Sequence, residues 1–211
     1  MKKVFFILCI TLIINNLSAQ NRFGGGVVLG FNAAQMDGDF AAGFHKVGLN
    51  VGLRGTARLN NDGRWLLTTE MLFSQRGARS VDSDNVSPDW KATLNYLEVP
   101  VLISYLDWAQ NDGAYYKVHF TAGLSYGRLF GSNITFPFTH PREAVDVFEQ
   151  NDLSYTAGLS YFMNRNWGFT WRYSRSLGYL FNPIKYKNEP VLGGLTALQG
   201  YFLTFQTCWN F

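Results

Sequence analysis

Hydrophobic and polar residues alternate along most of the chain from Phe23 onward. One face of each segment carries valines, leucines and aromatic residues, and the other carries small, polar or charged residues. This period of two residues is typical of β-strands whose two faces meet different environments. Eight segments with this pattern predict strands at residues 23–34, 45–59, 64–78, 93–106, 115–130, 152–163, 166–180 and 198–211.

The connections between these segments alternate in length. Short turns are expected at residues 60–63, 107–114 and 164–166, and longer loops at 35–44, 79–92, 131–151 and 181–197. Outer-membrane barrels have short periplasmic turns and long outer loops. An even number of strands also returns both chain ends to the periplasmic side.

Charged residues recur in the middle of the small, polar face. A soluble barrel or sandwich would place the apolar face inward, whereas this face is rich in glycine and serine and suits a narrow polar lumen. The sequence therefore predicts an all-β, eight-stranded antiparallel up-and-down transmembrane barrel. Its lumen would be plugged by a network of six charged side chains: Arg54, Arg58, Glu70, Glu98, Lys117 and Arg172. The alternative is a narrow channel for small solutes or ions, lined by the same groups.

Composition agrees with a folded barrel. The chain has 211 residues, of which 47% are hydrophobic, 17% aromatic and 16% charged, a balance that excludes a disordered protein. Past residue 20, no run approaches the ~20 apolar residues of a membrane-spanning helix, so a polytopic helical protein is excluded. The net charge of +3 gives no indication of a nucleic-acid partner.

The first residues have the pattern of an export signal. Lys2 and Lys3 precede an apolar stretch over residues 4–14, and Leu17-Ser18-Ala19 supplies small residues for cleavage. We expect residues 1–19 to be a signal peptide and residues 20–211 to form the barrel domain in the outer membrane of a Gram-negative bacterium. Cleavage would leave Cys208 as the sole cysteine, so no internal disulfide is expected.

Several aromatic residues lie near the predicted short turns. Trp65, Tyr115, Trp167, Trp209 and Phe211 would form an interfacial girdle at that end of the barrel. Within the fourth segment, Pro100 cannot donate a ladder hydrogen bond, which predicts a local bulge.

Three stretches of the chain also resemble a known family. They are Val28-Leu29-Gly30-Phe31-Asn32, the segment Glu70–Gly77, and Leu94-Asn95-Tyr96-Leu97-Glu98-Val99-Pro100. In this order, behind a signal peptide, they resemble the PorT-like outer-membrane β-barrel family of Bacteroidota-type bacteria, over roughly the whole mature chain. The resemblance implies a small, porin-like barrel without an assigned biochemical activity, and no feature of the sequence singles out the secretion-linked members of the family.

The last strand looks like the C-terminal signal by which the barrel-assembly machinery recognises its substrates. The residues that carry this likeness are Tyr201, Leu203, Phe205, Trp209 and Phe211, and Thr207 interrupts their apolar face. The expected partners are outer-membrane lipid, and the assembly machinery and periplasmic chaperones during biogenesis.

The remaining candidate chemistry is sparse. His45, His119 and His140 have no metal-ligand partner at a useful spacing, so neither a metal site nor a cofactor is expected. A lipid hydrolase would need a Ser/His/acid set such as Ser132 with His45 or His140, and no nucleophile motif supports one. The loop over residues 131–151 contains Phe136–Pro141 and could contact a protein or glycan partner. We therefore expect a non-enzymatic structural or interaction protein.

Overall fold

The described strands form a closed barrel. A computed structural model of the protein describes residues 22–37, 43–79, 91–110, 115–135, 142–143, 148–181 and 197–211. The predicted signal peptide (1–19) and the loop residues 136–141, which include His140, lie outside the described residues. The strands in the described ranges are β1 (Phe23–Asp37), β2 (Lys46–Arg58), β3 (Trp65–Arg79), β4 (Lys91–Gln110), β5 (Tyr115–Thr135), β6 (Arg142–Glu143), β7 (Asn151–Phe162), β8 (Trp167–Ser176) and β9 (Gln199–Asn210).

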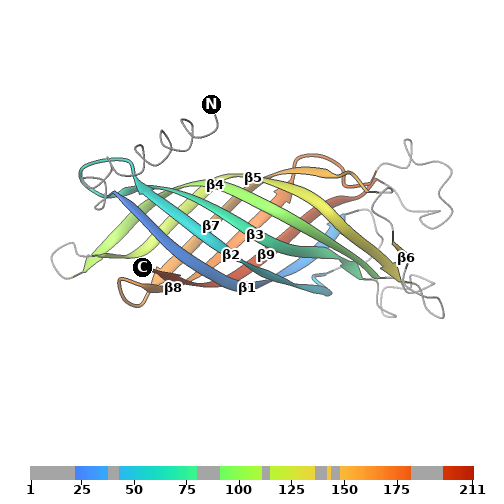
Figure 1. Ribbon diagram of the computed structural model, residues 1–211, viewed down its shortest axis with the longest axis horizontal. Helices are drawn as coiled ribbons and strands as arrows, with labels where there is room; N and C mark the ends of the chain where they lie inside the picture. Colours follow the sequence, from blue (N-terminus) through green and yellow to red (C-terminus); the bar gives the residue numbers. More distant parts are fainter. Residues whose placement is uncertain are drawn as a thin grey trace, which may run out of the picture.

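All neighbouring strands pair antiparallel. The order β4-β3-β2-β1-β9-β8-β7-β5 is closed into a ring by the additional pairing of β4 with β5. The short strand β6 pairs only with residues Asn133 and Ile134 at the far end of β5, so the ring itself has eight strands (Figure 1). The predicted eight-stranded fold is confirmed.

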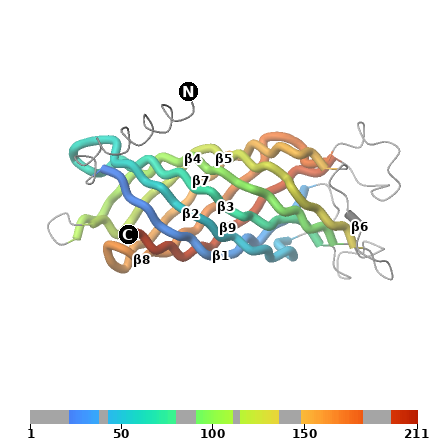
Figure 2. Tube along the Cα trace, in the orientation of Figure 1, coloured from blue at the N-terminus to red at the C-terminus, as the bar shows by residue number. Residues whose placement is uncertain are grey.

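The two ends of the barrel differ. The turns at residues 59–64 and 163–166 lie at the same end as the start of β1 and the end of β9, and we call this the turn end (Figure 2). The longer connections lie at the opposite, loop end. Among the described residues, no helix has the length and apolar character needed to cross a membrane.

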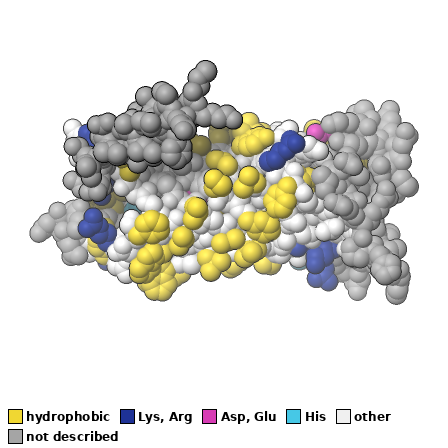
Figure 3. All heavy atoms as spheres, viewed as in Figure 1, with side chains coloured by type: hydrophobic (Ala, Val, Ile, Leu, Met, Phe, Trp, Pro, Cys, Tyr) yellow, Lys and Arg dark blue, Asp and Glu magenta, His cyan; other side chains and the backbone are white. Residues whose placement is uncertain are grey.

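The outward face of the wall is apolar. Leu29, Leu53, Val101 and Leu124 are 51–61% exposed, whereas the residues beside them in sequence face inward and are largely buried. Hydrophobic side chains accordingly cover the middle of the barrel surface, and Lys and Arg lie towards its ends (Figure 3). Such a surface suits the hydrocarbon region of a bilayer, where the closed ladder also pairs the backbone groups.

The boundaries of β4 and β5 differ most from the predicted ones. Pairs between these strands run from Lys91 with Thr135 to Gln110 with Tyr115, so both strands extend beyond the expected ends at residues 106 and 130. The apolar alternation fades at the loop end of β5 because its outward residues there, Gly131, Asn133 and Thr135, are polar or small, although Ser132 and Ile134 still face a packed lumen.

Pro100 does not form the expected bulge. It pairs with Ser125 in an unbroken register, and the register shift between β4 and β5 lies instead between Asn95 and Tyr96. Between β3 and β4, Thr69 pairs with Val101 and Leu72 pairs with Glu98, and no pairs form between these two positions. The ladder is therefore interrupted near Pro100, but its register does not shift. The missing proline N–H therefore costs hydrogen bonds but leaves the same residues facing inward.

Most of the expected girdle is present at the turn end. Trp65 packs edge-on against Tyr105 with ring centroids 5.3 Å apart, and Trp167 pairs with Trp209 across β8 and β9. Tyr115 is a correction, because it packs against the inward-facing Phe162 cluster and lines the lumen. It shares the inward parity of Thr121 on β5, so strict alternation would have placed it correctly.

Candidate functional site

The lumen is filled in layers. Along β3, the inward side chains from the turn end to the loop end include Thr68, Glu70, Ser74, Arg76 and Ala78, each of which belongs to a different layer. The layers are a cavity, an arginine–glutamate cluster, an amide and hydroxyl cluster, a second ion cluster and an apolar cluster. Each is assembled from strands that are distant in sequence.

The first ion cluster joins Glu70 to two arginines. The register of β2 and β3 places Arg54 opposite Glu70, and Arg54 Nε donates to Glu70 Oε1 at 2.7 Å. From β8, Arg172 donates through Nη1 to Oε2 at 2.6 Å and through Nη2 to Oε1 at 2.8 Å. All three residues are at most 7% exposed. Two cations against one carboxylate leave this cluster with a surplus positive charge.

Glycine makes room for one of these arginines. Gly158 on β7 pairs directly with Arg172, and a Cβ at position 158 would lie 2.7 Å from Arg172 Cγ. The small residues of the inward face therefore complement the long charged ones.

The amide and hydroxyl cluster lies next along the barrel. Asn32 Oδ1 accepts hydrogen bonds from Thr204 at 2.8 Å and from Asn50 at 3.2 Å, and Gln206 donates to Asn50 Oδ1 at 2.7 Å. Asn32 in turn donates to Ser74 Oγ at 3.0 Å. Most of these buried polar groups thus satisfy one another, whereas Gln206 Oε1 has no hydrogen-bond partner among the described groups.

The second ion cluster has the opposite charge balance. Arg76 Nη2 lies 2.5 Å from Glu98 Oε2, and Nη1 donates to Asp152 Oδ2 at 2.8 Å. Ser125 Oγ donates to Glu98 Oε1 at 2.6 Å, and the Arg76 guanidinium lies 3.9 Å from the centroid of the Phe202 ring. One cation against two carboxylates complements the surplus charge of the first cluster.

Apolar side chains fill the loop end of the lumen. Strand residues join Phe148, Leu180, Phe181 and Leu198, which lie outside the regular strands. The whole cluster comprises Met36, Ala78, Ala92, Leu94, Tyr96, Leu129, Ile134, Phe148, Leu180, Phe181 and Leu198, all at most 3% exposed. Sequence analysis missed this cap because its loop residues follow no period-2 pattern.

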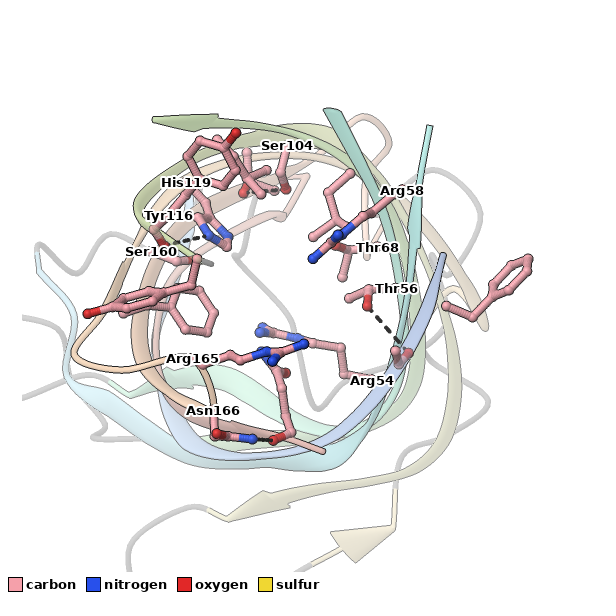
Figure 4. A pocket seen from close by; sticks show the side chains of 18 of the residues that line it. Arg54, Thr56, Arg58, Thr68, Ser104, Tyr116, His119, Ser160, Arg165 and Asn166 are labelled. Atoms are coloured by element: carbon pink, nitrogen blue, oxygen red, sulfur yellow. Dashed lines mark hydrogen bonds between the residues drawn. The ribbon is translucent and has the colours of Figure 1, made fainter. Parts of the chain in front are cut away.

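The turn end of the lumen is hollow. A cavity of about 550 Å³ is lined there by inward side chains of the barrel wall and of both chain ends, and Arg54 and Arg172 form its floor. Arg58 and Arg165 point into this space, above Arg54 (Figure 4).

The predicted lumen residues therefore fall into three groups. Arg54, Glu70 and Arg172 meet in the first ion cluster, and Glu98 belongs to the second. Arg58 is exposed and lines the cavity, whereas Lys117 lies at the rim with Nζ 5.2 Å from the centroid of the Trp108 ring. In the described part of the chain, neither pairs with a carboxylate.

The alternation predicts Arg76 on the inward face, although it is not one of the six predicted network residues, and Asp152 was not predicted. Both have the parity of the inward face, Arg76 with Ser74 and Asp152 with Ser154, so the alternation contained the signal. Their contact with each other spans 76 positions in sequence and could not be read from it.

The proposed C-terminal signal occupies the outward face of β9. Tyr201, Leu203 and Phe205 are partly exposed, and Trp209 and Phe211 are 52% and 78% exposed. Phe205 stacks on Phe31 of β1 with ring centroids 5.2 Å apart. Thr207, the polar interruption, accepts a hydrogen bond from Trp167 Nε1 at 2.6 Å, which gives this residue a structural role.

Of the described candidate hydrolytic residues, Ser132 and His45 form no hydrogen bond with each other, because Ser132 Oγ has no hydrogen-bond partner among the described groups. Ser132 is 1% exposed, and His45 is exposed at the start of β2. His119 lies within the lumen, with its ring stacked on Phe162 at 4.4 Å. The described residues contain no group of three or more His, Cys, Asp or Glu side chains that could hold a metal ion.

Comparison with solved structures found similar barrels. Ail of Yersinia pestis, 14% identical, has a TM-score of 0.49 over 90% of this chain and 99% of its own. Neisserial surface protein A has 12% identity and a TM-score of 0.44, over 90% of this chain and 97% of its own. OprG of Pseudomonas aeruginosa has 14% identity and a TM-score of 0.44, over 90% and 94%. No residue role is transferred from them.

Comparison of sequences gave one family. Among curated proteins, none matches the chain significantly. The profile described as "Outer membrane protein beta-barrel domain" matches residues 18–182, most of the chain. The protein is therefore located in the outer membrane and belongs to the outer membrane protein beta-barrel domain family.

Proposed function

We propose that this barrel is a sealed structural or interaction protein of the outer membrane. The observation that carries the proposal is the stack of buried layers between the cavity floor and the loop end. Two ion clusters, an amide cluster and an apolar cap occupy the described lumen one after another. Charged side chains are held by several partners each, so opening a path would break many contacts at once.

Conductance measurements test this proposal. The refolded mature protein is reconstituted in planar bilayers, and we expect the wild type to show no discrete single-channel steps. Glu70→Ala is expected to give at most an irregular leak, because it loosens one layer and leaves the apolar cap in place. Asp62→Ala, an exposed carboxylate in the turn between β2 and β3, is the control and should be silent. Discrete steps in the wild type would overturn the proposal.

A narrow channel is the second candidate. It is supported by the cavity at the turn end, which enters the lumen as far as Arg54 and Arg172. In that case, Glu70→Ala should change the size or ion selectivity of a conductance that the wild type already has.

The orientation and partners follow from the same architecture. We propose that the turn end faces the periplasm, as in other outer-membrane barrels, and that the loops at the opposite end contact a protein or glycan partner. The outward apolar face would meet lipid. The exposed aromatic residues of β9 support recognition by the barrel-assembly machinery, with periplasmic chaperones acting on the exported chain.

Two finer assignments belong to the proposal. The stretch Tyr96–Pro100, in which Glu98 is a lumen residue, supports placing the chain among the PorT-like barrels. We also propose that the protein is not an enzyme. The hydroxyl of Ser132 is buried and has no hydrogen-bond partner among the described groups, which supports this because nucleophile and base must lie within hydrogen-bond reach.

A further inference from the structure

The cavity at the turn end is an unusually basic space. Five arginines line it, namely Arg22, Arg54, Arg58, Arg165 and Arg172. No Asp or Glu side chain is among its described lining residues. Its volume of about 550 Å³ lies within the range of small-molecule sites.

The floor of the cavity carries a positive charge that is not balanced within its own cluster, because the acidic second ion cluster lies beyond the amide and hydroxyl cluster. Arg54 and Arg172 share the single carboxylate of Glu70, although both are buried. Arg172 Nε is buried and has no hydrogen-bond partner among the described groups. Buried cations are normally paired, so the surplus positive charge favours an anion at this place.

The walls add to the preference for an anion. Arg58 and Arg165 reach into the space above Arg54, so their guanidinium groups can approach one bound molecule together (Figure 4). Low-dielectric walls lined by one sign of charge concentrate the opposite charge inside a cleft. Hydroxyl groups of Thr56 and Thr68 line the same space and can donate hydrogen bonds.

We propose that this cavity, which we call the arginine cup, binds a small oxyanion of the phosphate class. Guanidinium groups match the oxygens of phosphate through paired N–H donors. The phosphate could belong to a soluble ester in the periplasm or to a lipid head group at the rim. The cup is a dead end in the sealed barrel, so its role is binding rather than passage.

Isothermal titration calorimetry with pyrophosphate tests the cup. The full mature protein is refolded in a zwitterionic detergent and titrated at constant ionic strength. We expect saturable binding at one site. Arg58→Ala and Arg165→Ala should each weaken it about tenfold, the usual effect of losing a hydrogen bond to a charged group. Both side chains are exposed, so these variants leave the buried ion cluster intact.

Arg64→Ala is the matched control. Arg64 lies at the same end of the barrel, but its Nη1 bonds to Tyr105 Oη and it does not line the cup. This variant should bind pyrophosphate as the wild type does. An equal loss in Arg64→Ala, or no saturable binding by the wild type, would overturn the proposal.

The same titration in nanodiscs distinguishes the two sources of phosphate. Binding that is equal in discs of phosphatidylcholine and of phosphatidylglycerol supports a soluble ligand. If phosphatidylglycerol weakens pyrophosphate binding by competition, and the Arg58→Ala substitution removes this competition, the natural ligand is a lipid head group. Because the readout is binding, its failure is distinct from the conductance result that would overturn the sealed barrel.

Discussion

At the residue scale, Glu70 is held between two arginines on different strands. Its two carboxylate oxygens accept three hydrogen bonds from two arginines, and the residue is 2% exposed. Its removal would leave Arg54 and Arg172 facing each other without a counter-charge. A buried pair contributes little net stability relative to an apolar replacement, but breaking it from one side is costly.

Glu70→Gln should therefore lower the free energy of unfolding by about 3 kcal/mol, as expected for a buried charge that loses its partner. Urea unfolding in detergent, followed by tryptophan fluorescence, measures the change. Asp62→Asn, in an exposed turn, should shift stability by less than about 0.5 kcal/mol. If the Glu70→Gln variant proved as stable as the wild type, the carboxylate would not be needed to balance the two arginines.

Alternation along the strands predicted which way most of these residues point. The period of two alone placed Arg54, Glu70 and Arg172 on the inward face. It could not choose partners, because Arg172 and Glu70 are 102 positions apart and meet only through the stagger of the closed ring. The arginine lining of the cup could not be predicted from the alternation either, because Arg22 and Arg165 lie outside the strands.

At the element scale, the bend of β3 near the loop end depends on Gly77. Its φ is +145°, and an added Cβ would lie 2.1 Å from the carbonyl oxygen of Ala92 on β4. Any side chain there would have to push the two strands apart while holding an unfavourable backbone conformation. Gly55 on β2 has no such constraint, because its Cβ would meet only Thr69 at ordinary contact distances.

Gly77→Ala should thus destabilise the barrel by about 1–3 kcal/mol, the cost of a strained backbone position. Gly55→Ala is the matched control, and it should be neutral or slightly stabilising because it reduces the freedom of the unfolded chain. The midpoints of urea unfolding compare the two variants directly. Equal midpoints would contradict the role assigned to Gly77.

The last strand offers a test of biogenesis. If the aromatic residues of β9 form the assembly signal, Phe211→Ala should reduce the amount of folded barrel in the outer membrane. Because Phe211 is 78% exposed, the stability of the refolded variant should change little. Heat-modifiable migration of membrane fractions measures assembly. Phe130→Ala, an outward aromatic residue that is 56% exposed near the loop end, is the control and should assemble normally.

Strand positions were predictable because lipid on one side and a filled lumen on the other impose a strict alternation. The loop-end cap was not predictable. Phe148, Leu180 and Phe181 follow no period, and their burial depends on the space that the closed ring leaves. The loop-end extension of β5 was not predicted because its outward residues Gly131, Asn133 and Thr135 are no longer apolar.

At the scale of the whole molecule, the apolar belt should make the wall sensitive to charge in proportion to depth. Leu124 lies outward in the middle of β5, and Leu59 lies outward at the turn end, with 51% and 52% exposure. An arginine near the bilayer midplane costs about 2–4 kcal/mol in such barrels, and about 0–1 kcal/mol near the interface.

Leu124→Arg should accordingly lower the stability of the barrel in lipid bilayers by about 2–4 kcal/mol, and Leu59→Arg by at most about 1 kcal/mol. Reversible unfolding from phospholipid vesicles measures both. A ranking in the opposite order would mean that the membrane does not centre on the middle of the strands.

The ring of strands also determines when the barrel can close during folding. The wall closes where β1 meets β9, from Gly26 with Asn210 to Asp37 with Gln199, so its first and last strands are neighbours. An incomplete chain that lacks β9 would leave β1 and β8 as open sheet edges, so the barrel could not close. Yet β1 and β9 pair in an antiparallel ladder of unbroken register, as continuous as the one between β1 and β2, which are joined by the chain. A circular permutant that links the two ends and opens elsewhere should therefore close into the same ring.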